Sequence, residues 1–188
     1  MCCVTMVTHE PHRPDLPSGE GLIRSLDPVP GTPARIRWVL LSYRLPREPS
    51  APRVATWRRL RALGAAQISD GLVALPLDAR TKEQLEWVAD DVTTHGGTAA
   101  IWVAVLSTSA EERLVVEDMS AVVADSYRAL LAEAHDAREL PPRARRRALT
   151  RLRRELRRLR RRDYFPPPEH QLAVEAVASL AELEDEPA

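Results

Sequence analysis

Residues 143–162 constrain the fold of this chain more than any other stretch. They hold twelve arginines and a single acid, Glu155, and their four leucines stand at positions 149, 152, 156 and 159. Spacings of three and four residues place these leucines on one side of an α-helix and leave arginine around the rest. Such a helix has to bury its narrow apolar seam, so the sequence predicts further helices that pack against it.

The segments on either side of this stretch carry the opposite charge. Residues 111–142 have a net charge of −5 and residues 163–188 of −7, against +11 for residues 143–162, in a chain whose total is zero. The neutral total hides this polarity and therefore says nothing about partners. Two alternatives stay open: the arginines pair with the acidic flanks, or they remain available to a polyanion.

The N-terminal residues 1–34 are rich in Pro, Gly, Asp and Ser and have no apolar periodicity, so we interpret them as a disordered leader or an over-extended start. Cys2, Cys3, His9 and His12 could ligate a metal, but such a leader offers no preformed geometry, and no metal site is predicted. No apolar run approaches the ~18 residues of a membrane span, and no secretory signal pattern is present. We expect a cytoplasmic protein.

Residues 35–107 alternate short apolar strands with helical patterns. The dipeptide Asp70-Gly71 is typical of a tight hairpin turn, and Gly64 is typical of a helix C-cap. The resulting order βαββαβ predicts an α+β fold, with a ferredoxin-like antiparallel sheet and both helices on one face. The predicted strands lie at 37–45, on both sides of Asp70-Gly71 and at 98–106, and the predicted helices at 53–64 and 78–95.

Four of these elements carry one tryptophan each, and we expect these rings to fill the core between the sheet and the helices. They are Trp38, Trp57, Trp87 and Trp102.

Residues 108–188 are predicted to form a C-terminal region of about three helices, at 111–138, 143–162 and 169–183. Between the last two helices, the prolines of "DYFPPP" place Tyr164 and Phe165 as an aromatic plug. The expected apolar stripes are Val115, Met119, Val122, Tyr127, Leu130 and Ala134 in the first helix, and Leu172, Ala176, Leu180 and Leu183 in the last.

Motifs of catalysis are not found in the sequence. No Ser/His/Asp set, glycine-rich phosphate loop or paired-carboxylate motif stands out, so we predict neither an enzyme nor a cofactor. His135 and His170 are expected to face solvent, and His95 precedes two glycines at a helix end.

The stretch "WVLLSYRLPREPSAPRVATWRRLRALGAAQISDGLVALP", followed by the arginine/leucine helix and "RRDYFPPP", resembles the N-terminal region of the ChrB chromate-resistance regulatory proteins. The likeness extends over residues 36–183. Longer members of that family continue into a second domain, so this chain resembles a stand-alone version. The resemblance implies a cytoplasmic DNA-binding regulator that responds to chromate and controls genes for a chromate efflux transporter.

The strand-loop-helix opening is also similar to the middle domain of the PaaX repressors and to small CRISPR-associated metal-dependent nucleases. In those nucleases a metal-binding aspartate ends the first strand. Ser42, Tyr43 and Arg44 stand at the corresponding place here, and Arg44 would repel a divalent cation. No nuclease site is therefore predicted.

Two groups of arginines are candidate binding residues, because the planar guanidinium binds oxyanions through paired hydrogen bonds. The candidates for chromate, each of which is also compatible with a simple solvated surface, are Arg44, Arg47, Arg53 and Arg58. The candidates for DNA are Arg143, Arg145, Arg146, Arg147, Arg151, Arg153, Arg154, Arg157, Arg158, Arg160, Arg161 and Arg162.

The predicted partners are promoter DNA of resistance genes and chromate as an effector. A membrane is not expected as a partner, because the leucine seam lacks the aromatic residues typical of interfacial helices. The alternative function is a non-catalytic protein–protein assembly module, in which the basic helix pairs with acidic helices and the leucine seam mediates dimerisation or docking. The sequence leaves open whether the chain forms a homodimer, as antiparallel sheets of this kind often do.

Overall fold

The computed structural model describes residues 35–185. The predicted leader at residues 1–34, including its candidate metal ligands, lies outside the described residues. The helices and strands of the described part are β1 (Arg37–Arg44), α1 (Ala51–Leu63), β2 (Ala66–Ser69), β3 (Leu72–Pro76), α2 (Ala79–Thr94), β4 (Thr98–Val105), α3 (Ser109–Ala137), α4 (Pro142–Arg160) and α5 (Pro168–Asp185).

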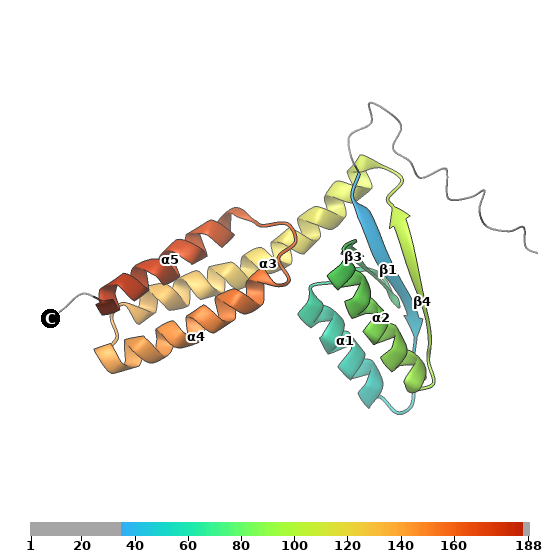
Figure 1. Ribbon diagram of the computed structural model, residues 1–188, viewed down its shortest axis with the longest axis horizontal. Helices are drawn as coiled ribbons and strands as arrows, with labels where there is room; N and C mark the ends of the chain where they lie inside the picture. Colours follow the sequence, from blue (N-terminus) through green and yellow to red (C-terminus); the bar gives the residue numbers. More distant parts are fainter. Residues whose placement is uncertain (1–34, 186–188) are drawn as a thin grey trace, which may run out of the picture. The chain divides into compact units, whose positions relative to one another are not determined.

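The four strands form one antiparallel sheet in the order β2-β3-β1-β4. In this order β3 separates β1 from β2, and β1 separates β3 from β4, which is the interleaving of two split βαβ units. Helices α1 and α2 lie on the same face of the sheet (Figure 1). The predicted α+β class, with an antiparallel sheet followed by C-terminal helices, is confirmed.

Local sequence signals position the ends of these elements. Gly64 caps α1 with φ +75°, and a Cβ atom at this position would lie 2.9 Å from the Cβ of Arg162. Gly71 joins β2 to β3 with φ +74°, and a Cβ there would collide with the carbonyl oxygen of Tyr43. Asp78 caps α2 by accepting a hydrogen bond of 2.7 Å from the backbone N–H of Thr81. At positions 64 and 71, glycine is required by the positive φ and by the close approach of neighbouring atoms.

The apolar core consists of two groups of buried residues. The sheet cluster joins Val39 and Leu75 of the sheet to Leu85 of α2, and the helix cluster joins residues of α3, α4 and α5. Helix α3 contributes to both, with Met119 in the sheet cluster and Tyr127 in the helix cluster. Because one helix serves both clusters, the division expected at residue 107 stays a prediction.

The expectation that four tryptophans fill the core is wrong for three of them. Trp38 is 2% exposed, whereas Trp57, Trp87 and Trp102 are 49%, 53% and 59% exposed. The cause in α2 is helical geometry, since Trp87 follows the buried Leu85 by two residues and therefore points about 200° away from it. The large size of an aromatic side chain favours burial, but its position on the helix or strand decides whether it is buried.

Two apolar residues of the expected helix stripes also face solvent. Val122 is 50% exposed and Leu172 is 52% exposed. The buried positions of α5 are Ala173, Val177 and Leu180, of which Leu180 belongs to the expected stripe. Apolar residues on α5 outnumber the positions that contact α3 and α4, so the sequence could not identify which of them form the contact.

Candidate nucleic-acid interface

Helix α4 is sharply divided between one buried side and one exposed side. It begins at Pro142, a favourable residue for a first helical turn, and its leucine seam packs against α3 and α5. The predicted seam is confirmed, and its buried members are Ala148, Leu149, Leu152, Leu156 and Leu159. The seam is thus covered by α3 and α5 of the same chain, and the alternative in which the seam docks another protein stays untested.

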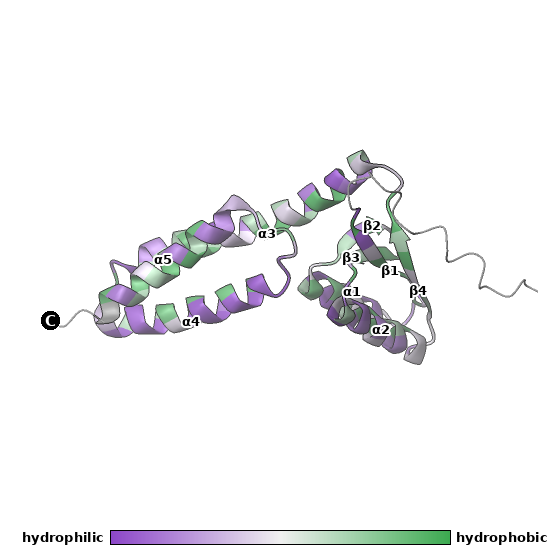
Figure 2. Cartoon of the chain, turned by 45° about the horizontal axis from the view of Figure 1, so that its top comes forward, coloured by the Kyte–Doolittle hydropathy of each residue, from purple (hydrophilic) through white to green (hydrophobic). Residues whose placement is uncertain are grey.

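The opposite side of α4 is a row of arginines, which we call the arginine ridge. At 100° per residue, each member lies within about 40° of the direction opposite Leu152, and the row is about 27 Å long. All members are exposed. Figure 2 shows α4 mainly in the colour of hydrophilic residues. The ridge consists of Arg143, Arg147, Arg154, Arg157 and Arg161.

Few carboxylates reach the arginines of α4. Arg151 pairs with Glu133 of α3, and the Nη1 of Arg158 lies 3.8 Å from the Oε2 of Glu155 in its own helix. Arg145 and Arg146 also have interaction partners. No member of the ridge forms an ion pair with any carboxylate of residues 35–183. Internal charge pairing therefore accounts for part of the helix and not for the ridge.

Three carboxylates of the acidic flanks contact residues outside α4. Glu169 of α5 pairs with Arg128 of α3, which also pairs with Asp125 of its own helix. Glu175 accepts a hydrogen bond of 2.8 Å from Gln171 within α5. The charges of the three helices nearly cancel in the sequence, but the ridge arginines do not pair with the acidic residues of the other two helices up to residue 183.

The last of the twelve arginines, Arg162, does not belong to the exposed surface. It is half-buried, and its Nη2 donates a hydrogen bond of 3.1 Å to the hydroxyl of Ser126 on α3. Burial lowers the pKa of this guanidinium, and nearby Arg158 acts in the same direction. Arg162 therefore differs from the exposed ridge arginines, and its predicted contact with DNA stays a prediction.

A buried polar cluster follows at the turn between α4 and α5. Asp163 has a side chain that is 1% exposed, and its Oδ2 accepts a hydrogen bond of 2.8 Å from the hydroxyl of Tyr127. The Nδ1 of His170 lies 2.7 Å from the same oxygen, so the expectation that His170 faces solvent is wrong. Burial, and then the neighbouring Asp163, raises the pKa of the Tyr127 hydroxyl above its usual value. The cluster fixes the C-terminal end of α4 to α3 and α5.

The two residues of the predicted aromatic plug pack against the sheet cluster, a place that the sequence did not indicate. The hydroxyl of Tyr164 donates a hydrogen bond of 3.0 Å to the carbonyl of Leu63 at the end of α1. The ring of Phe165 lies 6.0 Å from the ring of Trp38. The guanidinium of Arg80 on α2 lies 5.7 Å from the centre of the Tyr164 ring. These contacts join the end of α4 to both helices of the sheet.

The candidate chromate residues divide into two pairs. Arg44 and Arg53 line an open hollow of about 490 Å³ between the end of β1 and the start of α1, together with Tyr43, Trp57 and Asp70. Asp70 gives the rim a negative charge that opposes anion binding, and burial together with this carboxylate raises the pKa of Tyr43.

The second pair, Arg47 and Arg58, is exposed and does not line this hollow. Of the four candidates for chromate, the structure therefore brings only Arg44 and Arg53 together.

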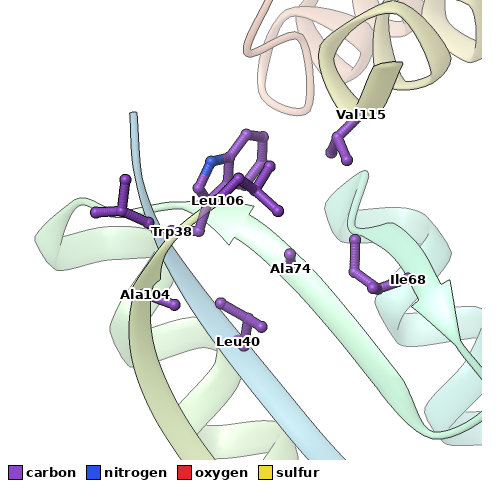
Figure 3. A pocket seen from close by; sticks show the side chains of 8 residues that line it. Trp38, Leu40, Ile68, Ala74, Ala104, Leu106 and Val115 are labelled. Carbon is purple, nitrogen blue, oxygen red and sulfur yellow. The ribbon is translucent and has the colours of Figure 1, made fainter. Parts of the chain in front are cut away.

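A second hollow, of about 60 Å³, lies on the face of the sheet opposite α1 and α2 (Figure 3). Its lining is almost entirely apolar and carries no charged side chain, so it has no group suited to an oxyanion. Sequence periodicity did not reveal it, because it forms where α3 leaves part of the sheet uncovered. The lining residues are Trp38, Leu40, Ile68, Ala74, Ala104, Val105, Leu106 and Val115.

Residues 35–185 contain neither a membrane-spanning helix nor a cluster of metal ligands. No helix in this part of the chain is long and apolar enough to cross a membrane. No group of three or more His, Cys, Asp or Glu side chains is placed there to hold a metal ion.

Comparison with known proteins finds a family that is similar to part of this chain. A family model described as "Protein ChrB, N-terminal" matches residues 53–141, which run from the first turn of α1 to the residue before α4. The resemblance expected over residues 36–183 is thus found for its central part. No curated protein and no solved structure matches the chain, and the likeness to the PaaX middle domain stays a prediction.

Proposed function

We propose that this chain is a transcriptional regulator of chromate resistance that binds DNA through α4, because residues 53–141 match the N-terminal family model of ChrB. In this proposal the arginine ridge contacts the phosphate backbone of promoter DNA near chromate-efflux genes. The protein acts without a catalytic step of its own.

The observation that carries the proposal is the lack of carboxylate partners along the ridge. Five exposed guanidiniums on a rod of about 27 Å can neutralise several phosphates at once, and each contact releases condensed counterions from DNA. Surface ion pairs stabilise folding by only about 0 to 1 kcal/mol each, so an internal structural role does not explain this number of arginines.

Phosphate contacts supply affinity without sequence choice, so a further element has to contact base edges. The family match ends at residue 141 and α4 begins at Pro142. The support from the family therefore concerns α1 to α3, while the support for α4 comes from its charge and exposure alone.

We further propose that chromate acts at the hollow between β1 and α1. Chromate is a tetrahedral dianion, and two guanidiniums, from Arg44 and Arg53, line the same cavity. Trp57 forms part of the wall, and the guanidinium of Arg61 lies 5.0 Å from the centre of its ring. The negative charge of Asp70 opposes chromate, so we expect the proposed site to bind it with moderate affinity and to release it on dilution.

The test is retention of the chain's own upstream DNA in a gel shift. We expect the ridge variant, with Arg147, Arg154, Arg157 and Arg161 each replaced by Gln, to lose retention while its circular dichroism spectrum is unchanged. The matched control removes the same charge from exposed positions elsewhere, by Arg37→Gln, Arg47→Gln, Arg58→Gln and Arg113→Gln, and should retain DNA. Equal loss in both variants would mean that only net charge matters, and full retention by the ridge variant would exclude α4.

The effector proposal is tested in the same assay. Chromate should release the DNA at concentrations at which sulfate does not. The double variant Arg44→Gln with Arg53→Gln should retain DNA and should no longer respond to chromate. If this double variant responds as the original chain does, chromate acts elsewhere.

A further inference from the structure

The two edges of the sheet differ in how they are protected. One edge is β2, which has four residues and a register shift between Gln67 and Ser69. The other edge is β4, which has eight residues paired in unbroken register with β1, from Thr98 to Val105. A short strand with an irregularity is a poor template for another strand, whereas a long regular one presents a full row of backbone donors and acceptors. Within residues 35–185, no strand pairs with the outer edge of β4.

The side chains of β4 also lack the usual protection of an edge. The strand reads TAAIWVAV, with no charged residue and no proline. Trp102 is 59% exposed and Val103 is 40% exposed, on opposite faces of the sheet. Natural edge strands of this length commonly carry a lysine, a proline or a bulge that prevents pairing. An eight-residue edge without any of these is suited to pairing.

We propose that the outer edge of β4 pairs antiparallel with β4 of a second copy of this chain, which makes one continuous eight-stranded sheet. If the two copies are related by a two-fold axis normal to the sheet, β4 of one copy runs antiparallel to β4 of the other. In such a pair, residues that lie opposite each other have their side chains on the same face of the sheet. Because side chains alternate between the two faces along a strand, these residues are both even-numbered or both odd-numbered. Trp102 then lies opposite its own copy or within a few residues of it.

The strand chemistry favours a second copy over a different protein. Self-pairing places identical side chains close together, which is unfavourable for charged residues and favourable for Ile, Val and Trp. Over eight residues the ladder is about 26 Å long. The strand carries no charged residue by which a different protein would be selected. Its backbone groups are complementary to those of an identical strand.

This inference concerns β4 and does not depend on DNA binding by α4. It goes beyond the proposed function, and failure of either leaves the other intact, because mass in solution and DNA retention are measured separately.

The experiment measures the mass of the full chain by light scattering and sedimentation equilibrium from low to high micromolar concentration. The original chain should dimerise. Trp102→Lys and Trp102→Glu should each raise the dimer dissociation constant by about tenfold or more, because like charges then oppose each other across the strands. An equimolar mixture of the two variants should restore a dimer, because the charges are then opposite.

The control is Ala55→Lys, which adds the same charge at an exposed position of α1 and should leave dimerisation unchanged. If circular dichroism shows that a Trp102 variant does not fold, Ala100→Lys, at an exposed position of β4, replaces it. A chain that stays monomeric throughout overturns the proposal, whether its edge is covered by another segment or by another partner. Dimerisation that Trp102→Lys and Ala100→Lys leave unaffected, or open-ended assembly, overturns it as well.

Discussion

Helices α1 and α4 both carry several arginines, yet their surroundings differ. Helix α4 buries five residues in one seam and presents its ridge on the far side, whereas α1 buries only Thr56 and Leu60. The arginines of α1 are interleaved with Trp57, and Arg53 lines a hollow that also contains Asp70. The same residue type is thus suited to a long polyanion on α4 and to a small anion beside α1. The neighbours of a guanidinium decide which ligand it fits.

The largest effect should come from breaking the seam that holds the ridge in place. Leu152 is 1% exposed, and Leu152→Ala should lower the free energy of unfolding by about 2–5 kcal/mol, because it removes buried methyl groups and leaves a cavity. Urea denaturation measures this change. Leu172→Ala, at an exposed position of α5, is the control, with an expected change within about 0.5 kcal/mol. Equal losses at both positions would contradict the packing of α4 and α5 described above.

The next effect concerns the buried polar cluster of Tyr127, Asp163 and His170, which fixes the end of α4. Tyr127→Phe removes a hydrogen bond to the buried Asp163 and should lower the free energy of unfolding by about 1–3 kcal/mol. Because the pKa of Tyr127 is raised in the folded state, its contribution is complete below the ordinary tyrosine pKa and is lost as the pH rises above that value. Thermal unfolding of the original chain should therefore show an alkaline decrease in stability that is smaller in the variant.

A smaller effect distinguishes a ridge arginine from a paired one. Arg154→Gln should weaken DNA binding by about 1 kcal/mol or more, and should reduce the slope of log affinity against log salt by about one. Arg151→Gln should change both less, because Arg151 is already paired with Glu133. Fluorescence anisotropy with labelled DNA over a salt series measures both quantities. A larger effect of Arg151→Gln than of Arg154→Gln would contradict the distinction between ridge arginines and paired arginines on α4.

The smallest expected effect on the fold is at the hollow. Arg53 is exposed, so Arg53→Gln should change the free energy of unfolding by no more than about 0.5 kcal/mol. DNA retention without chromate should be unaffected, while the chromate concentration that releases DNA should increase. Gel shifts over a chromate series measure this response. An unaltered response would separate α1 from the effector site.

Much of the fold followed from local signals that act over a few residues. The sequence predicts Gly64 as a helix cap and Gly71 as part of a turn, because both roles require a local backbone conformation that favours glycine. The sequence predicts the leucine seam of α4 equally well, because most positions outside the seam are occupied by arginine. In α5, where apolar residues surround the helix, Leu172 was assigned to the wrong side.

The candidate site was only partly predictable. The arginine content of α4 is visible in the sequence, but separating the ridge from Arg151, Arg158 and Arg162 required knowing which carboxylates and helices lie nearby. The bond between Asp163 and Tyr127 joins residues that are 36 positions apart, and no local pattern indicates it.

The sequence by itself determined the order of elements, their ends and the polarity of charge along the chain, because hydrophobic spacing, turn residues and capping act locally. Only the tertiary structure decided which arginines face solvent, which tryptophans are buried and which edge of the sheet lies open. These properties depend on contacts between distant segments, where burial and hydrogen bonding are settled by the competition of many side chains for a limited interior.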